Sequence, residues 1–210
     1  YNIEERIGGD SSLTEYGLQY ARKLGKRVSD IAELPPDRLV VWTSCLRRTQ
    51  ETAQFIRCKH RVRWQALNEI SSGVCEAITY KQMEAQYPDL VELRRRDKLM
   101  FRYPQGESYI DIIDRLQPVI FELERNTQPI IVVSHQAVLR CLLAYFLDIP
   151  RQKIPYMAIP FHTLIRIVPR DCSYDEERMP LHPLNVYDEI PRWMEEMERI
   201  HREKKKGNVL

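Results

Sequence analysis

His135 and the polar residues beside it form the group in this sequence best suited to chemistry. Ser134-His135-Gln136 directly follows residues 130–133, a short β-branched run typical of a buried strand. A helical pattern begins at once and places Arg140 one turn after Gln136. Open α/β folds bind ligands at the carboxyl ends of strands, and the first amides of a helix favour anions. The spacing therefore predicts a phosphate site, with a buried, hydrogen-bonded core histidine as the alternative.

A second strand-to-helix junction repeats this arrangement. Residues 39–42 predict a buried strand that stops at Thr43-Ser44, and a helical pattern follows. Arg48 lies near the start of that helix, where a cation opposes the helix dipole. An arginine placed there either binds an anion or points away to solvent. With both strands in one parallel sheet, Arg48, His135, Gln136 and Arg140 would come from strand carboxyl ends.

A basic segment at residues 94–102 is available to surround such a site. Arg94 and Lys98 are four residues apart, so on a helix they would repel each other unless an anion or acidic partner lay between them. Several cations with one histidine suit a substrate that carries more than one phosphate. The sequence has no Walker-type glycine-rich loop and no Asp-rich metal cluster, so metal-assisted phosphoryl transfer is not favoured.

Two loops offer further candidates with weaker local evidence. Gly8-Gly9 permits positive φ and close backbone approach to a ligand, but such a pair is more often an ordinary turn. Glu69 and Glu76 lie in an irregular loop at residues 67–76, and an isolated loop glutamate is usually solvated.

The elements that would position these residues alternate between strands and helices. Thr79 to Gln82 fits a capping box at the start of a helical segment that Pro88 interrupts. Pro118 inside a long amphipathic helix predicts a kink or a restart. The other predictions are a helix at 13–29, strands at 62–64 and 161–168, a polar loop at 169–187 and a charged helix at 188–206.

Composition sets modest bounds. The chain has 210 residues, 43% hydrophobic and 30% charged, and a net charge of +2, which argues for neither nucleic acid nor membrane partners. No apolar run approaches the roughly 20 residues that span a bilayer. The five cysteines form no CxxC pair, which favours reduced thiols, a cytoplasmic location and no structural zinc. The chain begins at Tyr1, so we expect the natural N-terminus to be missing.

Six segments together resemble one family. They read RIGGDSSLTEYG, VWTSCLRRTQETA, LNEISSGVCE, TYKQMEAQYP, FRYPQGESYIDIIDRLQPVI and SHQAVLRCLLAYFLD. In order, they are similar to the bisphosphatase half of the 6-phosphofructo-2-kinase/fructose-2,6-bisphosphatases, in the histidine phosphatase (phosphoglycerate-mutase-like) superfamily. The resemblance covers roughly residues 1–168. It implies a three-layer α/β sandwich in which helices flank a mostly parallel central sheet.

The resemblance also implies the site. Glu69 matches the family's general acid/base, which overrides its local interpretation, and His135 matches the second catalytic histidine. Arg48 matches the arginine that holds the reacting phosphate, and Asn2 matches a transition-state-stabilising asparagine. The positions that match substrate contacts are Gly8, Tyr80, Arg94, Lys98, Tyr109, Gln136 and Arg140. The anion between Arg94 and Lys98 would be the substrate's 6-phosphate.

The implied reaction converts fructose 2,6-bisphosphate to fructose 6-phosphate and phosphate through a phosphohistidine, without metal or cofactor. The implied parent is a homodimer with an N-terminal kinase domain. Residues 1–170 would form the phosphatase domain, and residues 171–210 a C-terminal loop and charged helix.

One departure from the family matters for activity. The family's nucleophilic histidine lies in an Arg-His-Gly motif on the first strand, a few residues before the position of Asn2. We expect that strand to be missing here, so the 210 residues alone should have severely impaired activity. The alternatives are a non-catalytic sugar-phosphate-binding or regulatory domain, and a phosphoglycerate mutase or broad phosphatase of the same superfamily.

Overall fold

The computed structural model describes residues 6–171 and 173–181 and has a three-stranded parallel sheet at its centre. Strand β1 (Val40–Thr43) lies between β2 (His60–Arg63) and β3 (Ile130–Val133). In the register, Thr43 is opposite both Arg63 and Val133, so the three strands end at the same level. The predicted strands at these positions are confirmed. The expectation that a first strand of the sheet is missing from these residues stays a prediction.

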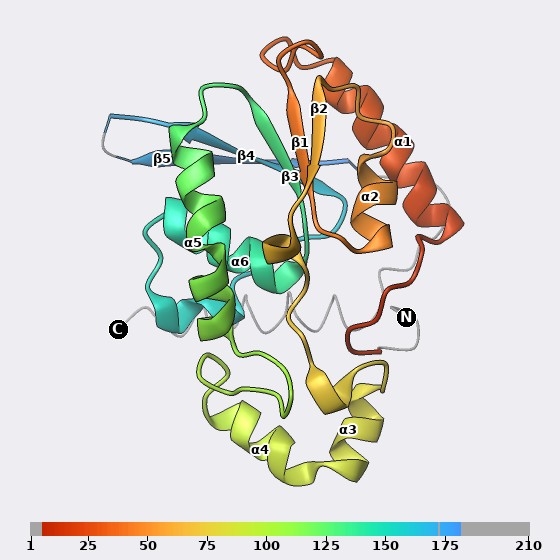
Figure 1. Cartoon of the computed structure of the whole chain (residues 1–210), viewed down its shortest axis with the longest axis vertical. Helices are drawn as coiled ribbons and strands as arrows, with labels where there is room; N and C mark the ends of the chain where they lie inside the picture. Colours follow the sequence, from red (N-terminus) through yellow and green to blue (C-terminus); the bar gives the residue numbers. More distant parts are fainter. Residues whose placement is uncertain (1–5, 172, 182–210) are drawn as a thin grey trace.

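Alternation along β1 divides the core between the two faces of the sheet. Val40 and Trp42 pack with α5 (Tyr109–Arg125) and α6 (Gln136–Phe146). Val41 packs on the other face with α1 (Glu15–Ser29) and α2 (Arg47–Ala53). Figure 1 shows these two helix pairs on opposite sides of the strands. The predicted α/β sandwich, with a parallel sheet flanked by helices, is confirmed.

Helix starts and interruptions follow local chemistry. Thr14 caps α1 by accepting from the amide of Gly17. Thr79 and Gln82 form the predicted capping box at the start of α3 (Tyr80–Gln86), and Pro88 begins α4 (Pro88–Arg96). Pro118 lies inside α5, which continues as one helix of 17 residues, so the predicted alternative of a restart is wrong.

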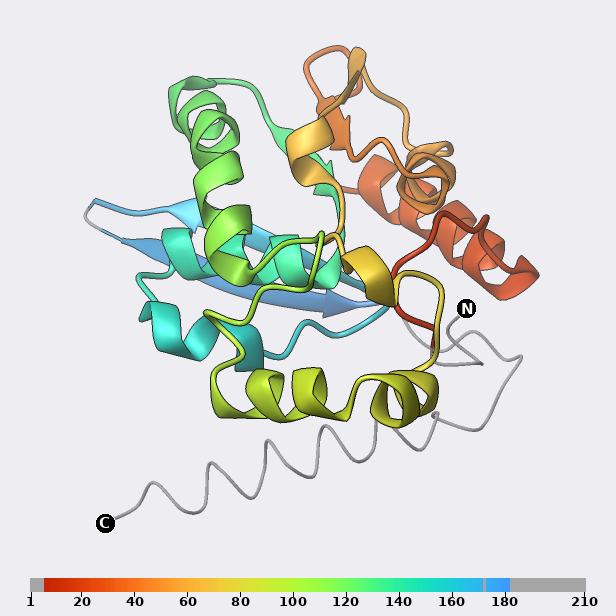
Figure 2. The same cartoon turned by 60° about the horizontal axis from the view of Figure 1, so that its bottom comes forward.

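Helices α3 and α4 form a separate group at the bottom of Figure 1, away from the helices that flank the sheet. In Figure 2, where the bottom of the molecule comes forward, the two helices are again neighbours. Their interior is a small apolar cluster around Cys75, Met83 and Tyr103. Two short 3-10 helices, Gln65–Leu67 and Gly73–Cys75, lie in the chain that leads from β2 to this group.

A second sheet corrects one sequence prediction. Strand β4 (Thr163–Pro169) pairs antiparallel with β5 (Tyr174–Pro180). The sequence predicted a strand at the position of β4 but a polar loop at the position of β5. Most of β5 is exposed, so it lacks the apolar alternation that identifies a strand. The hairpin crosses the expected domain boundary after residue 170. The predicted charged helix at 188–206 lies outside the described residues.

A third 3-10 helix, Arg151–Tyr156, follows α6. Among the described residues, no helix is both long and apolar enough to cross a bilayer.

Candidate active site

The register of the sheet brings the two strand-to-helix junctions together. Because Thr43 and Val133 are partners, Ser44 and His135 leave the sheet side by side. The Nε2 atom of His135 lies 2.8 Å from the Ser44 Oγ, and both side chains are buried. The predicted convergence of the two junctions is therefore present.

Arg48 determines which nitrogen of His135 carries the proton. Its Nε lies 3.2 Å from the His135 Nδ1, and a guanidinium can only donate. Nδ1 must therefore accept, which leaves the proton of the neutral ring on Nε2. Burial, together with the charges of Arg48 and Arg115, lowers the pKa of His135 to about 3. The imidazole is therefore neutral near pH 7.

A chain of hydroxyl groups continues from that proton. The His135 Nε2–H donates to the Ser44 Oγ, whose own hydroxyl lies 2.8 Å from the Thr49 Oγ1. Thr49 in turn donates to the carbonyl of Leu46 at 2.9 Å. Every donor in this sequence has an acceptor, so the ring is fixed in one orientation.

Arg48 points into the site rather than to solvent. Its Nη1 donates to the carbonyl of Gly9 at 2.7 Å, which connects the glycine loop to the sheet edge. The Gly9 amide donates to the Glu76 carboxylate at 2.8 Å, so Glu76 is not a free loop residue. Gly8 has φ +67°, and a Cβ there would lie 1.9 Å from the Glu76 Oε2. The loop needs glycine at this position because the carboxylate occupies that space.

Glu69 reaches the same place from its irregular loop. Its carboxylate accepts from its neighbour Ile70 at 2.9 Å and from the Ala137 amide in the first turn of α6. The positive charges of Arg48 and Arg140 also act on it. Burial is the largest effect and raises the pKa of Glu69 despite these interactions. A partly buried carboxyl with a raised pKa is suited to general acid catalysis.

Arg140 forms the next part of the site. It is buried, donates to the Tyr109 hydroxyl at 2.8 Å and to the carbonyl of Met157 at 2.8 Å. Burial raises the pKa of Tyr109, although Arg140 opposes this effect. Gln136, at the first position of α6, is partly buried.

The basic segment contributes two cations, but not through the shared helix face that the sequence predicted. Helix α4 ends at Arg96, so Arg94 and Lys98 do not share a helix face and that spacing argument is wrong. Arg94 lies over the Tyr80 ring at 5.9 Å and hydrogen bonds to Tyr103. Lys98 donates to the carbonyl of Pro155 at 3.1 Å.

These cations are connected to the rest of the site through shared neighbours. The Tyr109 that binds Arg140 also acts electrostatically on Arg94. Lys98 and Arg140 bind carbonyls two residues apart, at Pro155 and Met157. Shared neighbours thus connect Arg94 and Lys98 with Arg140 and Tyr109. Asn2 lies outside the described residues.

Several residues of this arrangement were not singled out from the sequence, namely Thr49, Tyr103, Glu107 and Arg115. Glu107 and Arg115 bind a loop that lies 36 to 49 residues earlier in the chain, so no local pattern indicates their role. Of the other described histidines, His60 is exposed on β2 and His162 contacts Tyr16 and Tyr20 of α1. Neither belongs to the site.

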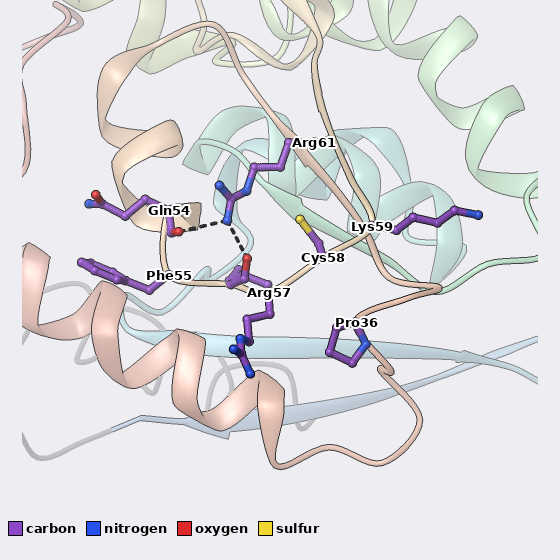
Figure 3. A pocket seen from close by; sticks show the side chains of 8 residues that line it. Pro36, Gln54, Phe55, Arg57, Cys58, Lys59 and Arg61 are labelled. Carbon is purple, nitrogen blue, oxygen red and sulfur yellow. Dashed lines mark hydrogen bonds between the residues drawn. The ribbon is translucent and has the colours of Figure 1, made fainter.

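A hollow of about 520 Å³ lies at the opposite end of the sheet. Residues at the end of α2 and the start of β2 line it, and Figure 3 shows Arg61 donating to the backbone of Gln54 and Ile56 there. Arg57 and Lys59 are exposed at its rim. None of the predicted site residues faces this hollow, so the candidate site is defined by the side chains described above.

Comparison with known proteins places this arrangement in a family. The profile of the histidine phosphatase superfamily (branch 1) matches residues 1–180. The chain belongs to this superfamily. A fructose-2,6-bisphosphatase of Saccharomyces cerevisiae is 49% identical over 171 residues, which cover 81% of this chain and 37% of the relative. The 6-phosphofructo-2-kinase/fructose-2,6-bisphosphatase of Aquarana catesbeiana is 44% identical over 192 residues, covering 90% of this chain and 40% of that protein.

Within the superfamily, this histidine phosphatase domain is homologous to part of these two proteins. It spans about two-fifths of the length of these two relatives. Solved histidine phosphatases share its fold. The α-ribazole phosphatase of Shigella flexneri superposes with a TM-score of 0.71 at 21% identity, covering 82% of this chain and 87% of that one. A mycobacterial glucosyl-3-phosphoglycerate phosphatase gives 0.68 at 22% identity, covering 84% and 91%.

Proposed function

We propose that the intact protein containing this domain hydrolyses fructose 2,6-bisphosphate to fructose 6-phosphate and phosphate. The observation that carries the proposal is the meeting of Glu69, whose pKa is raised, with Arg48, Arg140 and neutral His135 at the strand ends. Membership of the histidine phosphatase superfamily supports phosphoryl transfer as the reaction class. The names of the two relatives support fructose 2,6-bisphosphate as the substrate.

The proposed reaction has two steps. A histidine nucleophile, supplied by the Arg-His-Gly motif that family members carry ahead of the Asn2 position, attacks the phosphorus of the 2-phosphate. The bond from phosphorus to the sugar oxygen breaks, and Glu69 gives its proton to that oxygen. Water then attacks the phosphohistidine, Glu69 takes the water proton, and the phosphorus–nitrogen bond breaks. Asn2 is proposed to stabilise both transition states.

Arg48 and His135 are proposed to stabilise the phosphoryl oxygens during transfer. Arg48 is a fixed donor because its Nη1 and Nε are already oriented by Gly9 and His135. A bound phosphate would accept from the guanidinium, and its negative charge would favour the protonated imidazole. A proton on the His135 Nδ1 would replace the hydrogen bond that the Arg48 Nε donates to this atom, and would free both groups to donate to the phosphate. No cofactor is needed for these steps, because each proton has a side chain that donates or accepts it.

The far end of the sugar is proposed to be held by the basic segment. Arg94 and Lys98 would bind the 6-phosphate, while Tyr80, Tyr109, Gln136 and Arg140 contact the rest of the substrate and Gly8 lets the backbone approach it. The arginine side chain suits this role because it can bind a phosphate through two parallel hydrogen bonds. This second anion site is what separates the proposal from a phosphatase that acts on single phosphates.

The test uses the full-length protein and two glutamine substitutions. Glu69→Gln should lower kcat with fructose 2,6-bisphosphate by about 10²–10⁴-fold, the usual contribution of a general acid. Glu84→Gln, an exposed glutamate on α3, is the matched control and should leave kcat unchanged. Wild-type turnover by Glu69→Gln would refute the assignment.

Two further measurements separate the alternatives. Faster wild-type turnover of a phosphoglycerate than of fructose 2,6-bisphosphate would refute the proposed substrate. The encoded sequence ahead of Tyr1 should contain Arg-His-Gly and, further upstream, a kinase domain, and the parent is proposed to be a homodimer. Substrate binding without turnover by the full-length protein would favour a regulatory domain instead.

A further inference from the structure

The loop that carries Glu69 is held by its carbonyl groups. Arg115, on α5, donates to the carbonyls of Ala66, Asn68 and Glu69, the last two at 2.8 and 3.4 Å. The remaining carbonyl in this run, that of Leu67, accepts from another side chain. Backbone carbonyls in irregular loops normally bond to water or to nearby backbone, so this is an unusual concentration of distant contacts.

Glu107 orients Arg115 for this task. The two side chains form paired hydrogen bonds of 2.8 and 3.2 Å, and only 21% of Arg115 and 24% of Glu107 remain exposed. The Glu107 Oε2 also accepts from the Ser71 amide at 2.8 Å. The carbonyl of Ser71 accepts from the Glu107 amide at 2.8 Å. The ion pair therefore binds the loop on both sides of Glu69.

The same loop is tied to both strand ends of the site. Ser134, the residue before His135, donates to the carbonyl of Leu67 at 2.8 Å. The Oδ1 of Asn68 accepts from the Cys45 amide at 2.8 Å, directly after Ser44. These two hydrogen bonds fix the position of the loop relative to the residues around His135.

We propose that Arg115, oriented by Glu107, is a positioning residue that holds the Glu69 carboxyl against the first turn of α6. Arg115 donates to backbone and to Glu107, so it acts through Glu69 rather than on a substrate. A lysine keeps the charge but cannot reach three carbonyls and a carboxylate from one planar group. The significance of this clamp for catalysis rests on the proposed function, whereas its effect on Glu69 does not.

The test follows Glu69 directly in the 210-residue protein, by carbon-detected NMR titration of its carboxyl group. In Arg115→Lys, the released loop should expose the carboxyl to water and lower its titration midpoint toward that of a solvated glutamate, because burial is the main cause of its raised pKa. Amide hydrogen exchange at Ile70 should accelerate by about tenfold or more. The matched control is Arg125→Lys, on the same helix, where an exposed arginine pairs with Glu122.

A folded Arg115→Lys protein with the wild-type Glu69 midpoint and Ile70 exchange would overturn the proposal. Equal changes in Arg125→Lys would also overturn it, since they would reflect α5 as a whole. If Arg115→Lys does not fold, Glu107→Gln carries the same test through loss of the charged pair, with the same two readouts.

Activity gives an independent readout in the full-length protein. Arg115→Lys should lower kcat more than it changes KM, and the fall of kcat at alkaline pH should begin at a lower pH, since Glu69 must be protonated in the first step. An NMR shift without this kinetic change would leave the clamp in place and count against the catalytic role proposed for Glu69.

Discussion

Replacement of His135 by glutamine should reduce the dependence of the domain's stability on pH in mildly acidic solution. The imidazole is 6% exposed, and its pKa is lowered from 6.5 to about 3 by burial first and by Arg48 and Arg115 second. In the unfolded chain, His135 takes up a proton below about pH 6.5, whereas in the folded protein it stays neutral. Protons therefore favour the unfolded state over this range, and stability falls as the pH falls.

The size of the effect follows from the two pKa values. Stability from this group is complete above pH 6.5 and is lost progressively down to about pH 3. A difference of about 3.5 units corresponds to about 5 kcal/mol in full, of which about 2 kcal/mol is lost by pH 5. Glutamine does not titrate, and its side-chain amide can still hydrogen bond to the Ser44 hydroxyl. The variant should be less stable than the wild-type protein at neutral pH. Its free energy of unfolding should nevertheless fall less steeply with decreasing pH, because the contribution of His135 is absent.

The assay is urea unfolding followed by circular dichroism at about pH 7 and about pH 5. The wild-type protein should lose about 2 kcal/mol more between the two conditions than His135→Gln does. All other titrating groups, including Glu69, are common to both proteins and cancel in the comparison. Parallel slopes for the two proteins would refute the conclusion that His135 is buried as a neutral ring.

Three further outcomes are expected. Ser44→Ala removes the acceptor of the buried His135 Nε2–H and should cost about 1–3 kcal/mol in urea unfolding, and an unchanged unfolding midpoint would contradict the hydroxyl chain. Gly73→Ala should destabilise by at least about 2 kcal/mol, because φ is +51° and a Cβ would lie 2.0 Å from the carbonyl oxygen of Pro104. A wild-type melting temperature would show that the loop is free to relax. In the full-length protein, Arg94→Met should raise KM for fructose 2,6-bisphosphate by about tenfold or more, because one charged hydrogen bond to the substrate is lost. An equal fall in kcat with unchanged KM would contradict a binding role.

Periodicity and capping allowed most of the elements to be predicted. The β-branched runs that became β1 and β3, and the Thr79 capping box of α3, are local features, because the physical forces that produce them act between neighbouring residues. The strand ends could also be predicted as a site, since parallel strands bring their carboxyl ends to one edge. β5 could not, because its exposed residues are held by backbone pairing with β4 and show no apolar pattern.

The roles of individual side chains depended more on the tertiary structure. From local sequence, Glu69 is a solvated loop residue, and only the resemblance to a known family indicated chemistry. In the folded chain its carboxyl is buried against α6, because Arg115, some 46 residues away, binds its backbone. The sequence by itself therefore determined which elements form and which edge of the sheet carries polar residues. The tertiary structure decided protonation and orientation at that edge, since both depend on burial and on partners that are distant along the chain.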